Sequence, residues 1–204
     1  MKKTKNLIIL AIVLIIIGSC LLVVYQINDF RTQEKIAEEW IYKNGGSLNR
    51  DSFRFYIDLI YGDSITKVHL SSSPIQNINA LEKLYHLKSL HLYRTKITSI
   101  EPIKNLIHIE FLILAETQIK DIQPLQHLKN LKVLNLNNTN INNIESLKNL
   151  KQITNLHLCH TLVTDLSPLY NLKNLKELDI FSDLISKEQI ETLQSHLPNC
   201  QITY

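Results

Sequence analysis

The chain has 204 residues, of which 45% are hydrophobic and 20% charged, a composition typical of one folded domain with a targeting segment and not of a disordered chain. The formal net charge is only +3, and three lysines stand within the first five residues, so the remainder is close to neutral. A nucleic-acid-binding surface, which needs a basic face to displace counterions, is therefore not expected.

The first feature in chain order is an uncharged apolar run, LIILAIVLIIIGSCLLVVY, over residues 7–25. At about 1.5 Å per residue, a helix of this length can cross the hydrocarbon core of a bilayer. Lysines precede the run and mixed charges follow it, which places the N-terminus in the cytoplasm by the positive-inside rule. We expect a cytoplasmic basic tail over residues 1–6, a transmembrane or signal-anchor segment over residues 7–25, and a single-pass membrane protein whose remainder is periplasmic or extracellular.

Two alternatives for the apolar run remain open. A cleavable signal peptide also begins with positive charge followed by an apolar stretch. The sequence Ile17-Gly18-Ser19-Cys20 resembles a bacterial lipoprotein signal, in which Cys20 would be lipidated and become the new N-terminus. The run continues through Leu21 to Val24, which favours the uncleaved anchor, and all three interpretations export the rest of the chain.

Residues 26–64 are predicted to form a helical cap that folds onto the first repeat. Helical spacing relates Phe30, Gln33, Ala37, Trp40 and Ile41, and the sequence Asn44-Gly45-Gly46 is a suitable helix stop. Asp51 or Ser52 is then expected to begin a second short helix, which ends by Gly62.

From residue 65 the chain repeats itself every 22 residues. Apolar residues occupy positions 1, 4, 6, 11, 14, 17 and 20 of each unit, and position 9 is threonine in four consecutive units. This periodicity predicts five repeats over residues 65–174 and a C-terminal repeat with its cap over residues 175–204. The units begin at Ile65, Leu87, Ile109, Leu131, Ile153 and Leu175.

The pattern LxxLxLxxTxIxxIxPLxxLxx resembles the leucine-rich-repeat family in its internalin-like form of 22 residues, and the closing LPNCQITY resembles the terminus of another bacterial leucine-rich-repeat type. The resemblance implies an α/β solenoid, a curved right-handed superhelix. In it, positions 3 to 7 form strands of a concave parallel sheet, and a partly 3₁₀ return runs along the convex side. It also implies a module for protein–protein recognition.

The residues agree with such a solenoid on physical grounds. Positions 4 and 6 point to the same face of a strand, so both leucines of each unit are expected in the core. Proline at position 16 suits a short return. The threonines at position 9 are expected to satisfy backbone groups where the chain leaves the strand, a place taken by Ser73 and Asp183 in the flanking units.

The last unit is expected to end in a helical cap and a further strand. Ser186 is a good N-cap for a helix that buries Ile190, Leu193 and Leu197. Counting 22 residues onward from Leu175 places Cys200 at position 4 and Ile202 at position 6 of a seventh strand, both facing the core.

Catalysis, cofactor binding and metal binding are not expected. The sequence has no GxSxG elbow, no glycine-rich phosphate loop and no paired carboxylates in a predicted pocket. His157, Cys159 and His160 lie close together but lack the spacing of a metal motif, so a metal-free surface cluster is expected. Cys159 should face the concave surface and Cys200 the core, two strands away, which predicts no disulfide.

The concave face is the predicted binding surface. Its central positions carry the apolar residues Phe111, Ile113 and Val133, and polar residues surround them, as at many protein interfaces. The predicted partner-binding residues are Tyr93, Phe111, Ile113, Val133, Asn135, His91, His157 and Phe181.

We expect an externally displayed protein-recognition module anchored in a membrane. One alternative is an inhibitory or structural partner of another envelope protein. The other is a glycan-binding module, with Tyr93, Phe181, Asp179 and Asn135 as the contacts.

Overall fold

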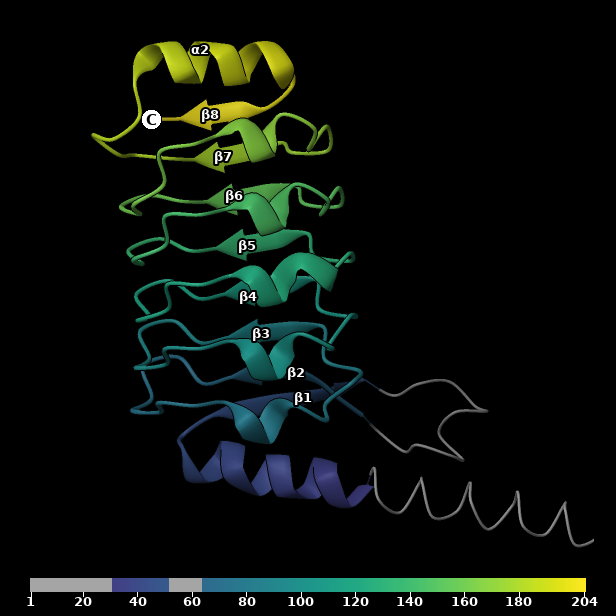
Figure 1. The fold of residues 1–204 in the computed structure, drawn as a ribbon. Coiled ribbons are helices and arrows are strands. Elements are labelled where there is room, and N and C mark those ends of the chain that lie inside the picture. Colours follow the sequence, from purple (N-terminus) through teal and green to yellow (C-terminus); the bar gives the residue numbers. More distant parts are fainter. Residues whose placement is uncertain (1–30, 52–63) are drawn as a thin grey trace, which may run out of the picture.

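In the computed structural model, residues 31–51 and 64–204 are described, and they form one open, stacked solenoid (Figure 1). A sheet of eight strands in the order β1 to β8 makes one wall, and short 3₁₀ helices make the other. The apolar run over residues 7–25, Cys20 and the second helix expected in the N-terminal cap lie outside the described residues. Within the described ranges, the structure has no helix that is long and apolar enough to cross a membrane.

In the described part of the N-terminal cap, residues 31–43 are helical, and Ala37 and Ile41 are fully buried against the first repeat. The helix stops at the predicted place: Gly45 adopts φ +72°, and the Gly46 N–H donates to the Ile41 carbonyl at 2.9 Å. A side chain at position 46 would clash, because an added Cβ would lie 2.5 Å from Leu70 Cδ2.

A carboxylate also attaches this helix to the sheet. Glu34 is 5% exposed, and its Oε1 accepts a hydrogen bond from the Ile65 N–H at 3.1 Å. After the helix, β1 (Ser47–Asp51) pairs antiparallel with β2 (Ser64–His69) at the end of the sheet. This strand was not expected, and Asp51 ends a strand where the sequence suggested a helix start.

The remaining strands are parallel, and neighbouring strands pair residues 22 positions apart from β2 to β7. This register confirms the repeat length, and it places every position of a unit directly beside its equivalent in the next. The strands are β3 (Ser89–His91), β4 (Phe111–Ile113), β5 (Val133–Asn135), β6 (Asn155–His157), β7 (Glu177–Asp179) and β8 (Gln201–Thr203).

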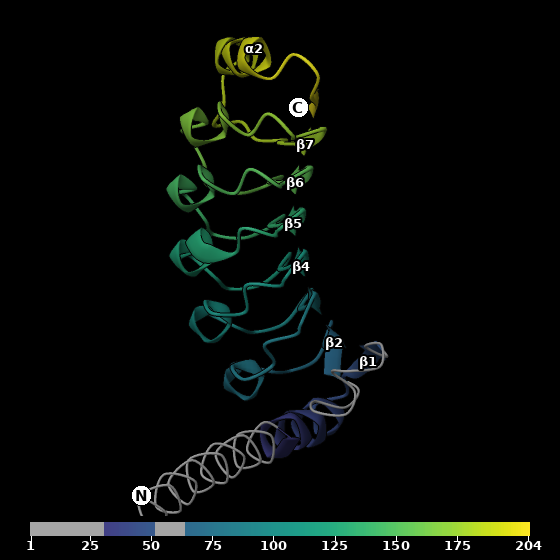
Figure 2. The same cartoon turned by 90° about the vertical axis from the view of Figure 1, so that its right-hand side faces the viewer.

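The opposite wall consists of 3₁₀ helices, as the short proline-bearing returns predict. Proline lies in the first turn of three of them, where its fixed φ suits the helix and no helical hydrogen-bond donor is lost. Figure 2 shows these helices along the outer side of a shallow curve and the strands along its inner side. The 3₁₀ helices are η1 (Asn79–Leu81), η2 (Glu101–Ile103), η3 (Gln123–His127), η4 (Glu145–Leu147) and η5 (Ser167–Leu169).

A continuous apolar core fills the space between the two walls, from Ala37 to Cys200. The threonines at position 9 lie at its edge and bond the backbone as expected. Each hydroxyl donates to the carbonyl three residues earlier, for example Thr117 Oγ1 to the Leu114 carbonyl at 2.6 Å. The same bond is made by Thr95, Thr139 and Thr161.

The residue before each of these positions has a left-handed backbone conformation. One non-glycine residue per unit takes a φ between 54° and 60°, a conformation that side chains other than asparagine, aspartate and glycine adopt at some cost. These residues are Ser72, Arg94, Glu116, Asn138 and His160.

The C-terminal cap is the helix α2 (Lys187–His196), which lies across the end of the stack (Figure 1). Ser186 and Gln189 form a capping box at its start, which confirms the predicted N-cap. The strand after it differs from the prediction: Ile202 pairs with Leu178 and therefore takes position 4, not position 6. The helical cap uses two residues more than the usual return, so counting 22 residues gave the wrong register.

Candidate binding surface

The inner face of the sheet carries positions 3 and 5 of each unit in two columns. Parallel pairing in register places Phe111 beside Val133 and Ile113 beside Asn135. The residue between them on β4, Leu112, points to the opposite side and is 0% exposed. The alternation predicted from the sequence is therefore correct for this strand, and it leaves two apolar side chains on the inner face.

The apolar centre predicted from the sequence is formed by Phe111, Ile113 and Val133 on the neighbouring strands β4 and β5. Phe111 is 42% exposed, and the other two side chains are half-buried. Tyr93 lies just beyond the end of β3 and is 37% exposed. Its hydroxyl donates to Glu116 Oε1 at 2.9 Å, which holds the ring at the edge of this centre and raises the pKa of Tyr93.

A pair of histidines borders the apolar centre on its N-terminal side. His91 is paired with Ile113 on one side and with His69 on the other. The two imidazole rings meet edge to face, with centroids 4.2 Å apart. Burial, and then the proximity of His69, lower the pKa of His91 below its ordinary value of 6.5. The surroundings of His91 therefore favour its neutral imidazole ring beside the apolar surface.

Hydrogen-bonded polar groups border the centre on its C-terminal side. Asn135 Oδ1 accepts from the Asn137 N–H at 3.0 Å, and Asn137 Oδ1 accepts from the Cys159 N–H at 2.7 Å. His157 is paired with Asn135 across the two strands. These bonds order the polar side chains before any partner arrives, so fewer rotamers are lost when a ligand binds.

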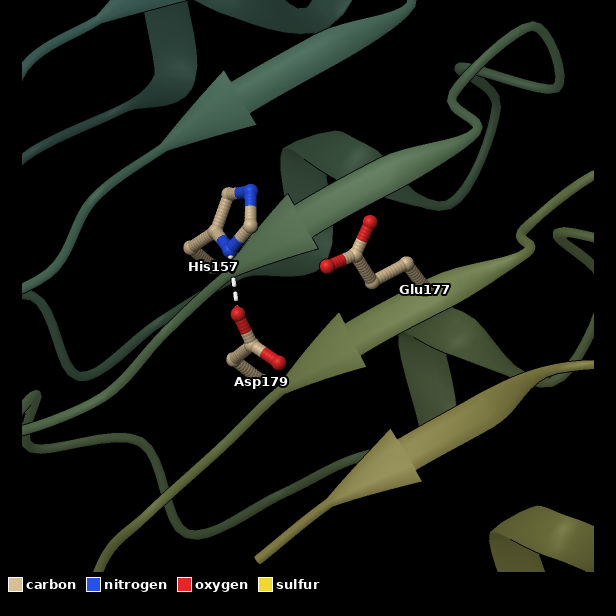
Figure 3. A group of neighbouring side chains, drawn as sticks. All are labelled: His157, Glu177 and Asp179. Carbon is tan, nitrogen blue, oxygen red and sulfur yellow. Dashed lines mark hydrogen bonds and ion pairs between the residues drawn. The ribbon is translucent and has the colours of Figure 1, made fainter.

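The next strand adds two carboxylates that the sequence analysis did not group with His157. His157 Nδ1 lies 2.6 Å from Asp179 Oδ2, and Asn155 Nδ2 donates to Glu177 Oε2. Figure 3 shows both carboxylate side chains on β7, next to His157 on β6. One nitrogen or oxygen atom from each of the three residues lies within 4.8 Å of the other two. The repeat spacing was the available signal for His157 and Asp179, since it places position 5 of one unit beside position 5 of the next, but Glu177 stands at position 3 and pairs with Asn155.

The three residues that lie close together in the sequence, His157, Cys159 and His160, are arranged differently. Cys159 Sγ accepts a hydrogen bond from the Phe181 N–H at 3.4 Å. The His160 ring meets the Phe181 ring edge to face, with ring centroids 5.5 Å apart. Cys159 and Cys200 are both free thiols, and burial, followed by the charge of Glu177, raises the pKa of Cys200 to about 11.

Phe181 does not belong to the apolar centre. It lies beyond the end of β7, is 57% exposed, and lines a separate hollow of about 380 Å³ together with Ile185 and Tyr204. The structure therefore brings together seven of the eight predicted binding residues along β3 to β6 and places the eighth at the C-terminal end of the stack.

Comparison with known proteins agrees with this architecture. A family model described as Leucine Rich repeats (2 copies) matches residues 107–149. Among solved structures, the chain is similar to an internalin (inlF) of Listeria monocytogenes, with 26% identity and a TM-score of 0.53 over 68% of this chain and 46% of that one.

Two further structures are similar. Internalin C2 of Listeria monocytogenes shares 29% identity with a TM-score of 0.52, over 68% of this chain and 70% of that one. A leucine-rich-repeat protein of Leptospira interrogans shares 26% identity with a TM-score of 0.65, over 76% of this chain and 41% of that one. No curated protein sequence matches the chain. The chain spans less than half the length of the first and third of these structures.

Proposed function

The chain carries internalin-like leucine-rich repeats, and we propose that it is a recognition module that binds a protein partner through the inner face of β3 to β6. The observation that carries the proposal is the apolar centre formed by Phe111, Ile113 and Val133. Strands of this fold need apolar residues only on the core side, so these three side chains are not required by the packing of the solenoid. An exposed aromatic and aliphatic centre within a polar border is the usual anatomy of a protein interface.

The size of this face limits what kind of binding it supports. Seven parallel strands about 4.8 Å apart give a face about 29 Å long, and the three residues of each strand from β3 to β8 make it about 10 Å wide. The resulting area, roughly 300 Å², is smaller than the ~800 Å² that one partner contributes to a standard interface. A tightly bound partner would therefore also contact the turns beyond the strands, where Tyr93 lies.

We further propose that the apolar run over residues 7–25 anchors the module in a membrane with the repeats on the outer side. The support is the sequence: an uncharged run of sufficient length, lysines before it and mixed charges after it. A lipid on Cys20 would give the same orientation. Intact-mass measurement of the mature protein separates the two, because lipidation would remove the first nineteen residues and add acyl mass.

The test of recognition is chemical crosslinking in native membranes, followed by purification of the tagged full chain and mass spectrometry. The informative variant is Phe111→Ala combined with Ile113→Ala, which removes two of the three side chains of the apolar centre without touching the core. Ile107→Ala is the matched control, since Ile107 is an aliphatic residue that is 49% exposed on the turn before β4. We expect the double variant to lose the crosslinked partner and the control to retain it. Retention of every partner by a folded double variant would refute this site.

The result also separates the proposal from its two alternatives. A crosslinked partner that is itself an envelope enzyme, and that loses activity when bound, would identify the module as an inhibitor. Binding to a glycan array in the absence of any protein partner would favour a glycan-binding module.

A further inference from the structure

A cluster of metal-ligand side chains lies on the inner face of the sheet, beside the proposed protein-binding centre. His157 on β6 and Glu177 and Asp179 on β7 each offer one ligand atom, and these atoms lie within 4.8 Å of one another (Figure 3). We propose that these three residues bind a divalent transition-metal ion such as Zn²⁺. The site does not depend on the proposed recognition of a protein.

The donor set determines the class of metal. One imidazole nitrogen and two carboxylate oxygens suit Zn²⁺ and its neighbours, whereas Ca²⁺ takes six to eight oxygen ligands and Mg²⁺ is bound through oxygen and water. Three protein ligands on an open face leave at least one coordination position for water or for a side chain of a bound partner. The site is therefore of the open type, unlike a closed structural zinc site with four protein ligands.

The backbone that holds these side chains is well fixed. His157 and Asp179 are directly paired across β6 and β7. The preceding residues of the two strands, Leu156 and Leu178, also pair with each other and are fully buried. Asn155 Nδ2 donates to one oxygen of Glu177, which orients that carboxylate from its neighbouring strand. The side chains of His157 and Asp179 are 21% and 26% exposed, so a metal ion could reach them from solvent.

Metal binding requires only a small adjustment. Two ligand atoms, each about 2.1 Å from a tetrahedral zinc ion, lie about 3.4 Å apart. His157 Nδ1 and Asp179 Oδ2 are now 2.6 Å apart, so they would separate by less than 1 Å while the ion replaced their direct contact. The ligand atom of Glu177 lies within 4.8 Å of the other two, so it would move closer to them by at most about 1.4 Å. Rotation of these partly buried side chains would supply both shifts.

A simple ion pair between His157 and Asp179 explains only part of the cluster. It uses one carboxylate and leaves the second, on Glu177, close to the first. A divalent cation would balance both carboxylates together.

The test is a zinc titration of the purified full chain in mild detergent, measured calorimetrically and by competition with a chromogenic zinc chelator. We expect one Zn²⁺ per chain. We also expect Asp179→Asn, Glu177→Gln and His157→Ala each to weaken binding by more than the roughly 10- to 100-fold loss typical when an outer-shell partner is removed. Asn155→Ala should fall within that smaller range. Thermal unfolding monitored by circular dichroism would show that each variant is folded.

Two control variants separate this site from adventitious zinc binding, since the chain has eight histidines. His91 occupies the same repeat position as His157 but lies beside His69 and not beside carboxylates, so His91→Ala should bind Zn²⁺ as wild type does. Cys159→Ser tests the nearby thiol and should also leave the affinity unchanged. If Asp179→Asn and Glu177→Gln bind as tightly as wild type, if His91→Ala or Cys159→Ser weakens binding as much as His157→Ala, or if wild type shows no saturable site, the proposal is overturned.

Discussion

Phe111 on β4 and Val133 on β5 are directly paired, while Leu112 and Leu134, one residue further along each strand, form the equivalent pair inside the core. Two adjacent apolar pairs of one sheet thus have opposite environments. The Leu112–Leu134 pair is required by the solenoid, and the Phe111–Val133 pair is available to a ligand.

This difference predicts unequal effects on stability. Leu112→Ala removes a fully buried side chain and should lower the free energy of unfolding by about 2–5 kcal/mol. Phe111→Ala lies on the other face and should change it by about 0.5 kcal/mol or less, as most surface substitutions do. Urea unfolding followed by circular dichroism measures both. Equal losses for the two variants would mean that Phe111 is part of the core.

The threonine at position 9 offers a second test. Thr139→Val keeps the shape of the side chain but removes the hydroxyl that donates to the Leu136 carbonyl at 2.6 Å. Leaving that buried carbonyl without this donor should cost about 1–2 kcal/mol. At the equivalent position of the first unit, the buried Ser73 Oγ has no hydrogen-bond partner among the described residues, so Ser73→Ala should cost less than about 0.5 kcal/mol. The same urea experiment decides, and a larger loss at Ser73 than at Thr139 would contradict this explanation.

The histidine pair predicts a pH dependence. The pKa of His91 is lower in the folded protein than its ordinary value of 6.5, because burial and His69 disfavour the charged ring. As the pH falls below 6.5, the unfolded chain takes up the proton first, so this residue destabilises the fold progressively until the folded protein is protonated as well. Well above pH 6.5, His91 is neutral in both the folded and the unfolded chain and does not make the stability depend on pH.

The measurement compares the melting temperatures of wild type and His91→Gln at pH 7.5 and pH 5.5. Other groups titrate in both proteins. The informative quantity is therefore the change in melting temperature of wild type between the two pH values minus the same change for His91→Gln. Wild type should lose more stability than His91→Gln on acidification. An identical shift in the two proteins would show that His91 does not titrate differently on folding.

Most of the solenoid follows from one periodicity. The spacing of 22 residues determines the register of β2 to β7, and the alternation within each strand determines which leucines are buried. The position of the threonines and the cap at Ser186 also follow from local chemistry. Each of these predictions depends on a pattern that recurs or on a short motif with one favoured geometry.

The prediction failed where the pattern stops. The strand Ser47–Asp51 is polar apart from Leu48 and belongs to no repeat, and it forms the sheet edge by pairing with β2. The register of β8 was wrong by two residues, because a helix replaces the usual return before Ile202. The cluster of His157, Glu177 and Asp179 depends on how side chains converge across two strands, and column positions alone do not show that convergence.

Site-specific photocrosslinking tests the binding proposal most directly. A photoreactive amino acid would be placed at Ile113, in the apolar centre, and in a separate protein at Ile107, which is also apolar and lies on the turn before β4. Illumination of native membranes should give a covalent adduct of defined mass from position 113 and none from position 107. Adducts of equal yield from both positions, or an adduct from position 107 alone, would contradict the assignment of the inner face as the recognition surface.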